Sequence, residues 1–153
     1  MFDVYNDDFI LAQGTSTGSL PESIEKEKQI GRIQRENFRR AYRAGARLAF
    51  GTDAGVYPHG GNAKQFAKMV EWGMKPIEAI QTATLNAAAL LGWQDKVGAL
   101  KPGYHADLIA VEGDPTVKVS ILESVKFVLK GGEIAKNDYE GSGRTRAASA
   151  LPP

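Results

Sequence analysis

Leu48-Ala49-Phe50-Gly51-Thr52-Asp53-Ala54-Gly55 is the stretch of this sequence that decides the fold. Its first three residues are apolar, and so short an apolar run predicts a buried strand. Gly51 ends the run, Asp53 follows among small residues, and Gly55 lets the chain turn away. A helix is predicted to begin soon afterwards, at 61–63. The resulting order of strand, acidic loop and helix is the order of a βα unit.

Asp53 is the residue of this stretch that can carry chemistry. In α/β barrels the catalytic groups lie on loops at the carboxyl ends of the strands, which is where Asp53 is predicted to lie. An aspartate in that place can bind a metal ion or take a proton from a water molecule. The alternative is a turn aspartate or a helix cap, which spacing alone favours because aspartate is common in turns.

The residues before this stretch predict a helix that leads into the strand. Residues 22–44 have strong helical propensity, and Gly45 is placed to end the helix. Apolar side chains recur along it at three- and four-residue steps, namely Ile30, Ile33, Phe38, Ala41 and Tyr42. Arginines are frequent on this helix, but glutamates interleave with them, which favours a solvated face over a nucleic-acid surface. Further upstream, residues 13–23 predict a loop and Phe2–Tyr5 predicts a strand.

Two helices are predicted after the acidic loop. Asn62 is a candidate N-cap for the first helix, whose apolar face includes Phe66 and which Gly73 ends. Pro76 suits the first turn of the second helix, and Gly92 breaks the helical pattern. We assign these helices a structural role and no chemistry.

From Val97 onward the hydrophobic period changes to that of strands. The predicted strands cover residues 98–100, 106–111, 125–129 and 133–134. Gly131-Gly132 predicts the hairpin turn between the last two strands. The C-terminal residues 136–153 are rich in Gly, Ser, Ala and Pro without an apolar period, and they predict a disordered tail.

Three motifs of this sequence resemble, in the same order and spacing, motifs of the metal-dependent amidohydrolase superfamily. They are Gly51–Gly60, the helical segments Pro76–Ile80 and Ala83–Ala88, and the segment Gly98–Ile109. Within that superfamily the sequence is most similar to the imidazolonepropionase-like branch, which includes the Xaa-Pro dipeptidases (prolidases). The resemblance covers residues 2–133.

The resemblance implies an α/β fold, the C-terminal part of a (β/α)8 TIM barrel followed by part of a small β-sandwich domain. We expect residues 1–94 to supply the last barrel strands and helices and residues 95–135 to supply the small composite β domain, before the tail at 136–153. A complete barrel takes about 250 residues. The present 153 residues are therefore expected to be a C-terminal fragment of a longer enzyme.

The resemblance also implies the residues of a hydrolytic site. Asp53 would serve as metal ligand and as general base and acid, while His59 and Tyr5 would contact the substrate. The alternatives are a loop histidine bonded to backbone and a packed tyrosine at a strand end. The implied cofactor is a divalent metal, zinc by the resemblance, with one or two ions in the complete protein. A bound metal ion lowers the pKa of water and so generates a nucleophile at neutral pH.

The other metal ligands of the superfamily are missing from this sequence. It contains no His-x-His pair, and its histidines are His59 and His105, the second of which is expected to be structural. A single carboxylate does not hold a catalytic zinc ion, which takes three protein ligands. We therefore expect the isolated chain to be inactive.

Composition narrows the function classes further. The formal charge of +1 at pH 7 argues against nucleic-acid binding, and the absence of cysteine excludes a disulfide framework and a thiolate metal site. No apolar run approaches the roughly 20 residues of a membrane span. The N-terminus carries Asp7 and Asp8 instead of a basic leader, which predicts a cytoplasmic protein.

The sequence thus leaves two readings of function. The first is a hydrolase of amide bonds, acting on Xaa-Pro dipeptides or on other N-acyl amino acids, cyclic amides or phosphotriesters. The second is a non-catalytic assembly or binding module, either a homo-oligomer or a piece that complements a separate N-terminal half. Exposed apolar helix faces and self-association would accompany the second reading.

Overall fold

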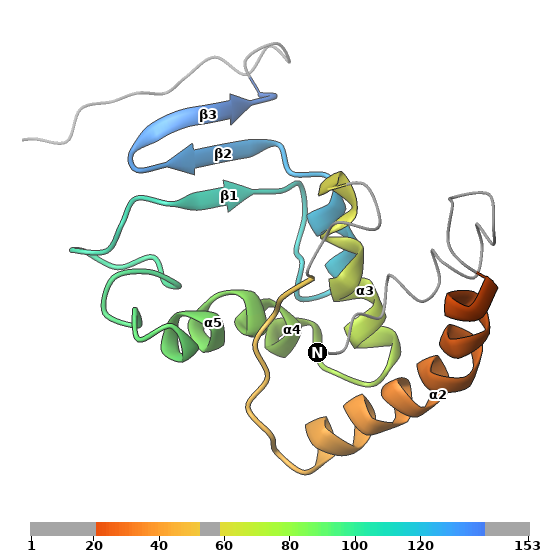
Figure 1. Cartoon of the computed structure of the whole chain (residues 1–153). Helices are drawn as coiled ribbons and strands as arrows, with labels where there is room; N and C mark the ends of the chain where they lie inside the picture. The colour runs from red at the N-terminus through yellow and green to blue at the C-terminus, as the bar shows by residue number, and fades with distance from the viewer. Residues whose placement is uncertain (1–20, 53–58, 140–153) are drawn as a thin grey trace, which may run out of the picture.

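The computed structural model describes residues 21–52 and 59–139 (Figure 1). The predicted strand Phe2–Tyr5, the candidate residues Tyr5 and Asp53, and most of the predicted tail lie outside the described residues. No helix within the described ranges is both long enough and apolar enough to cross a membrane.

The first described helix, α2, covers Pro21–Arg43 and confirms the helix predicted upstream of the strand. Glu22 lies in its first turn and Arg40 and Arg43 in its last turn, charges that complement the helix dipole. Gly45 follows with a positive φ of 75°, as predicted for a residue that ends a helix. Phe38 is the residue of the apolar stripe that is buried, whereas Ile33 is 54% exposed.

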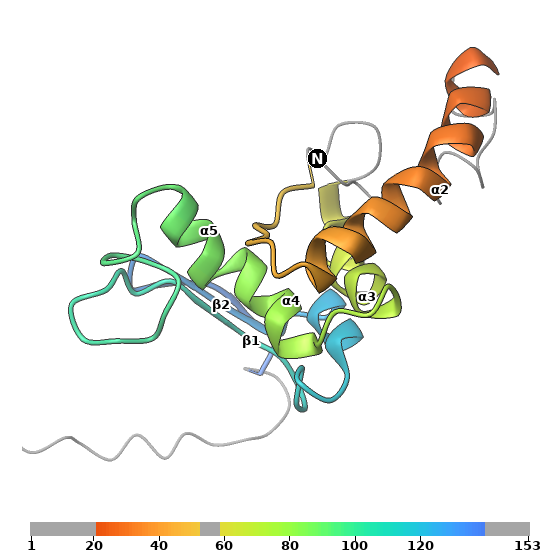
Figure 2. The same ribbon diagram turned by 90° about the horizontal axis from the view of Figure 1, so that it is seen from below.

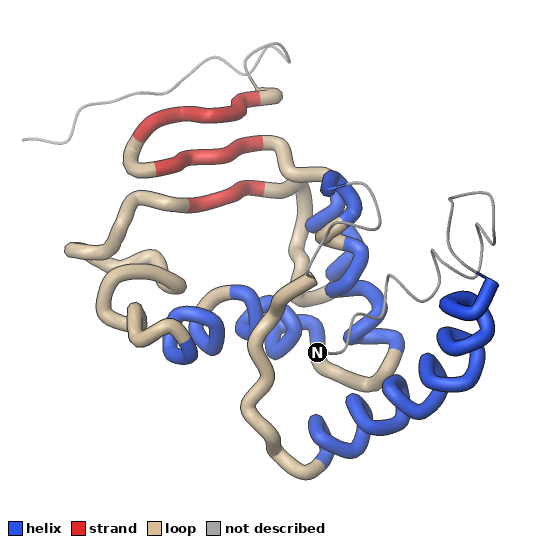
Figure 3. Tube along the Cα trace, viewed as in Figure 1, coloured by secondary structure: helices blue, strands red, loops and turns tan. Residues whose placement is uncertain are grey.

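Residues 46–52 belong to neither a helix nor a strand, so the predicted strand at Leu48–Phe50 is wrong (Figure 3). A strand requires a neighbouring strand to complete its ladder. Within the described part of the chain the segment bonds to helices instead: Phe50 N–H donates to the Thr82 carbonyl at 2.9 Å. Leu48 and Phe50 are half-buried against the core, while Arg47, Ala49 and Gly51 are exposed.

After the undescribed residues 53–58 come η2 (His59–Gly61), a single 3-10 turn, and α3 (Lys64–Glu71). Ala63 occupies the N-cap position of α3 and no side chain caps the helix, so the prediction of an Asn62 cap is wrong. The Asn62 side chain instead accepts a hydrogen bond from Thr52 Oγ1 at 3.1 Å. Gly73, with φ of 102°, follows the helix as predicted.

The next two helices are α4 (Pro76–Ala83), with proline in its first turn as predicted, and α5 (Leu85–Leu90). The main core lies where α2, α3 and α4 meet. Its buried members are Phe38, Met69, Trp72, Met74 and Ala79, and Phe50 stacks on Phe66 beside them with ring centroids 4.6 Å apart. The helix order and the core together hold residues 46–52 between α2 and the α4–α5 pair (Figure 2).

A three-stranded antiparallel sheet follows, in the order β1-β2-β3. Its elements are β1 (Leu108–Ala110), the 3-10 helix η3 (Val119–Glu123), β2 (Phe127–Lys130) and β3 (Glu133–Asn137). The hairpin at Gly131-Gly132 is confirmed, and β3 extends to Asn137, beyond the predicted end of the β module at 135. The predicted strand at 98–100 is wrong, because those residues carry no ladder. In Figure 1, β1 is the strand nearest to α4 and α5, and η3 packs against α3.

A side chain at Gly98 would collide with the fold. Its φ is +89°, and a Cβ placed there would lie 2.8 Å from the Thr84 carbonyl oxygen and 2.9 Å from Ala88 Cβ. Gly98→Ala is expected to lower the free energy of unfolding by about 2–4 kcal/mol, from left-handed strain plus overpacking. Urea denaturation followed by circular dichroism measures the change.

Gly103→Ala is the matched control for this prediction. Gly103 has a φ of +84°, close to that of Gly98, but a Cβ there would meet nothing within 4 Å. Gly103→Ala is expected to lower the free energy of unfolding by about 1–2 kcal/mol, from backbone strain alone. Equal losses in the two variants would contradict the packing of residues 97–99 against α5.

Candidate functional site

The predicted catalytic residue, Asp53, directly follows residues 46–52, and the helices α4 and α5 hold this segment in place. Asn86 Nδ2 donates to the Leu48 carbonyl at 2.9 Å, and Phe50 N–H donates to the Thr82 carbonyl at 2.9 Å. Two hydrogen bonds therefore join the segment to α5 and to α4. Nothing in the sequence pairs Asn86 with Leu48, since 38 positions separate them.

A further hydrogen bond joins the described residues on the two sides of 53–58. Thr52, which directly precedes Asp53, is 9% exposed and donates its hydroxyl to Asn62 Oδ1 at 3.1 Å. Asn62 stands just before α3, so the loop leaves and re-enters the described structure at neighbouring points. The described residues on the two sides of 53–58 are thus joined by a hydrogen bond.

The structure describes only some of the residues predicted to form the site. Asp53 and Tyr5 lie outside the described residues, and His59 begins η2 with its side chain outside the description. His105 is exposed in the turn before β1, where its N–H donates to the Lys96 carbonyl at 2.8 Å. His105 therefore lies in the turn where it was predicted, and its structural role stays a prediction. The assignments of Asp53, His59 and Tyr5 stay predictions.

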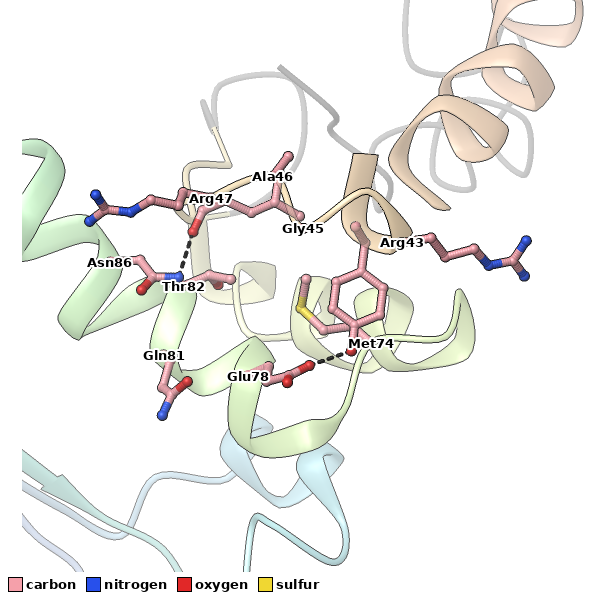
Figure 4. Close-up of a pocket in the computed structure, with 11 residues that line it drawn as sticks. Arg43, Gly45, Ala46, Arg47, Met74, Glu78, Gln81, Thr82 and Asn86 are labelled. Atoms are coloured by element: carbon pink, nitrogen blue, oxygen red, sulfur yellow. Dashed lines mark hydrogen bonds between the residues drawn. The ribbon is translucent and has the colours of Figure 1, made fainter. Parts of the chain in front are cut away.

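A cavity of about 490 Å³ lies at the other end of the same segment, beside residues 45–48 (Figure 4). Its lining residues are Tyr42, Arg43, Gly45, Ala46, Arg47, Leu48, Met74, Glu78, Gln81, Thr82 and Asn86. Arg43 and Arg47 extend away from one another in Figure 4, so they do not converge on one anion. Because Thr52 is not among the lining residues, this cavity and the Asp53 loop belong to opposite ends of the segment.

The polar contact that closes one wall of this cavity joins α2 to α4. Tyr42 donates its hydroxyl to Glu78 and also accepts the Lys75 N–H at 3.3 Å. The hydrogen bond to Glu78, together with burial, raises the pKa of Tyr42 above its ordinary value. The pair is 36 residues apart in the chain and carries no recognisable sequence signal. We interpret this hydrogen bond as a contact that holds α2 against α4.

The described residues do not supply a metal site. Among residues 21–52 and 59–139 there is no group of three or more His, Cys, Asp or Glu side chains that could hold a metal ion. A metal at the Asp53 loop would therefore need ligands from outside this set.

Asp107 is a charged residue of the β module that the sequence analysis did not single out. It is the acceptor for Lys130 and for the Gly131 N–H, the second at 2.6 Å. The hydrogen bond from Lys130 chiefly, with that from Gly131, holds the pKa of Asp107 below its usual value. The carboxylate thus joins the start of β1 to the turn between β2 and β3.

The hairpin is expected to loosen at low pH through this carboxylate. Because the folded-state pKa is lowered, the contribution of Asp107 is complete above the unfolded pKa of about 3.9 and is lost as the pH falls through the folded value. Asp107→Asn should remove that part of the acid dependence. Denaturation midpoints of both proteins between pH 7 and acid give the comparison. The pKa of Asp114 is also lowered, by its hydrogen bonds with Thr116. Because Asp114 is present in both proteins, its contribution to the acid dependence is the same in both and drops out of the comparison. If the denaturation midpoints of the two proteins fell in parallel with pH, the stabilising contact of Asp107 with Lys130 and Gly131 would be contradicted.

The profile of the amidohydrolase family matches residues 8–137 of this chain. The chain belongs to the amidohydrolase family. Its fold is similar to that of a solved Xaa-Pro dipeptidase with methionine bound in the active site: TM-score 0.80 and 40% identity, covering 88% of this chain. A prolidase solved with N-methylphosphonate-L-proline has a TM-score of 0.79 at 27% identity over 86% of this chain.

Ochratoxinase from Aspergillus niger is 34% identical over 132 residues, which cover 83% of this chain. The present chain spans 27% of the length of that ochratoxinase and 34% and 33% of the dipeptidase and prolidase chains. The expected resemblance to the prolidase-like amidohydrolases is thereby confirmed, and it extends over part of each relative.

Proposed function

We propose that this chain is the C-terminal portion of a metal-dependent hydrolase of amide bonds, and that its substrates are Xaa-Pro dipeptides. The observation that carries the proposal is the likeness to the Xaa-Pro dipeptidase, at 40% identity and a TM-score of 0.80 over 88% of the chain. The family match over residues 8–137 supports the broader reaction class.

In this proposal residues 1–94 contribute the last strands and helices of a barrel and residues 95–135 contribute part of a small β-sandwich. Asp53 is a metal ligand and the general base and acid, on a loop at the carboxyl end of the 46–52 segment. The ties from Asn86 to Leu48 and from Thr52 to Asn62 support this placement, since they hold both sides of the loop. His59 and Tyr5 contact the substrate.

The metal of the proposal is zinc, one or two ions, held by Asp53 together with residues that this chain does not contain. When bound, such an ion supplies electrostatic stabilisation and an activated water. The isolated chain has two histidines and no His-x-His pair. We therefore propose that it does not turn over substrate by itself.

A chimeric enzyme tests the proposal. The third of the Xaa-Pro dipeptidase that this chain covers is replaced by the complete 153-residue chain, and hydrolysis of an Xaa-Pro dipeptide is measured with zinc. We expect turnover by the chimera, loss of turnover with a chelator, and none from the isolated chain. A folded chimera without activity, or an active isolated chain, would refute the proposal.

A substrate panel tests the finer assignment in the same chimera. Xaa-Pro dipeptides are compared with N-acyl amino acids whose second residue is not proline. Higher kcat/KM for the proline dipeptides supports the proposal, whereas preference for the other amides would keep the hydrolase and remove the Xaa-Pro assignment.

A further inference from the structure

Thr52 is the last described residue before 53–58, and its side chain makes a largely buried polar contact. Thr52 is 9% exposed, and its hydroxyl donates to Asn62 Oδ1 at 3.1 Å. Asp53 follows Thr52 directly in the sequence, so one peptide unit, about 3.8 Å between Cα atoms, joins the two residues. A contact that orients Thr52 therefore acts one residue away from the predicted catalytic carboxylate.

Asn62 is fixed by the first turn of α3. Its backbone carbonyl accepts the Gln65 N–H at 3.2 Å, and Gln65 is 4% exposed. In the same turn, Phe66 stacks on Phe50 with ring centroids 4.6 Å apart. This stack holds α3 beside the 46–52 segment independently of the hydrogen bond that the Asn62 side chain makes.

The side chain of Asn62 is not used in the way that its place before a helix would favour. Asparagine is a preferred N-cap residue, because its side-chain oxygen can accept a backbone N–H of the first turn. No side chain forms such a cap on α3. The Asn62 oxygen accepts the Thr52 hydroxyl instead. The hydrogen bond with Thr52 thus takes the place of one that would stabilise the helix, which favours a role for Asn62 at Thr52.

We propose that Asn62 is a positioning residue, which orients Asp53 for proton transfer through its hydrogen bond with the Thr52 hydroxyl. This rests on the proposed function, because it takes Asp53 as the general base and acid. Misplacing a reacting group by about 1 Å can cost about 10²-fold in rate. Loss of the hydrogen bond should therefore lower kcat. It should leave KM nearly unchanged, because neither Thr52 nor Asn62 is a substrate-binding residue of the proposal.

Steady-state kinetics of the chimeric enzyme, with an Xaa-Pro dipeptide and zinc, test the proposal. Thr52→Val removes the hydroxyl at nearly constant volume, and Asn62→Ala removes its acceptor. Each should lower kcat about 10–100-fold with KM within about twofold of the original. Thr52→Ser keeps the hydroxyl and should retain most of kcat. The double variant should be no slower than the slower single variant, because both substitutions remove the same hydrogen bond.

Thr84→Val is the matched control for Thr52→Val. The Thr84 hydroxyl donates to the Ile80 carbonyl at 3.0 Å and is also part-buried, but this contact lies within the α4–α5 pair. Its loss should leave kcat within about twofold. An equal fall of kcat in the two variants would overturn the proposal, because general loosening of the fold would then explain both. A raised KM at unchanged kcat in Thr52→Val or Asn62→Ala would also overturn it.

A second measurement, on the complete 153-residue chain, does not depend on catalysis. NMR relaxation of the backbone amides should give a lower order parameter at Asp53 in Thr52→Val and in Asn62→Ala than in the original chain. Thr52→Ser should leave the order parameter of Asp53 unchanged. An order parameter that responds to neither of the first two substitutions would overturn the proposal.

The two readouts separate this inference from the proposed function. If the original chimera were inactive and the order parameter of Asp53 responded as expected, the proposed function would fail and the orientation of Asp53 by Asn62 would stand. If the original chimera were active and both Thr52→Val and Asn62→Ala kept full kcat, the proposed function would stand and the positioning role of Asn62 would be refuted.

Discussion

Asp53→Asn is expected to lower kcat/KM of the chimeric enzyme by about 10³-fold. Removing a group that handles a proton in the transition state costs about 10²–10⁴-fold, and the loss of a metal ligand adds to this. Asparagine keeps the size of the side chain and removes its charge, so the loop held by the Thr52–Asn62 tie should persist. Steady-state kinetics with an Xaa-Pro dipeptide, together with zinc content by elemental analysis, measure the effect.

Asp114→Asn is the matched control for this substitution. Asp114 is an exposed turn residue whose carboxylate accepts hydrogen bonds from the Thr116 N–H and hydroxyl at 2.8 and 2.6 Å. It should leave kcat/KM within about twofold, because exposed substitutions rarely perturb a distant site. If Asp53→Asn retained full activity and full zinc content, the assignment of Asp53 would be wrong.

Trp72→Ala is expected to lower the free energy of unfolding by about 3–5 kcal/mol, the usual cost of removing a large buried aromatic side chain. Trp72 is 6% exposed and meets the Phe38 ring edge-on, with centroids 5.7 Å apart. Arg35 also lies over its ring at 5.9 Å. Domains have roughly 5–15 kcal/mol of total stability, so this loss should bring the chain close to unfolding. Guanidinium denaturation followed by circular dichroism measures it.

Trp93→Ala makes the same chemical change outside the core. Trp93 is 52% exposed and follows α5, with Lys96 over its ring at 5.8 Å. Its loss should cost about 1 kcal/mol or less, because little packing is removed. Comparable losses for the two tryptophans would contradict the core at the junction of α2, α3 and α4.

Helices and turns were predictable because their signals are local. The helix over 22–44, the helix stops at Gly45 and Gly73 and the proline start of α4 all follow from propensity and backbone freedom within a few residues. The hairpin at Gly131-Gly132 is of the same kind. Each of these predictions is confirmed, since the interactions that decide it lie inside the segment itself.

The failed predictions concern residues whose partners lie elsewhere in the chain. Asn62 has the right type for an N-cap, yet its side chain bonds Thr52 across the loop. Leu48–Phe50 has the composition of a strand, but its hydrogen bonds go to α4 and α5. Residues 98–100 look like a strand and instead carry Gly98 against α5.

The sequence by itself determined the helices, the hairpin, the family and the choice of Asp53 as the candidate catalytic residue. It did so because propensities, glycine conformations and the order of motifs are properties of short segments. Only the tertiary structure decided that the 46–52 segment bonds to α4 and α5, that Thr52 bonds to Asn62, and that Tyr42 and Asp107 join elements distant in the sequence. Those outcomes depend on hydrogen bonds between residues tens of positions apart, and such pairings exist only once packing has brought the partners together.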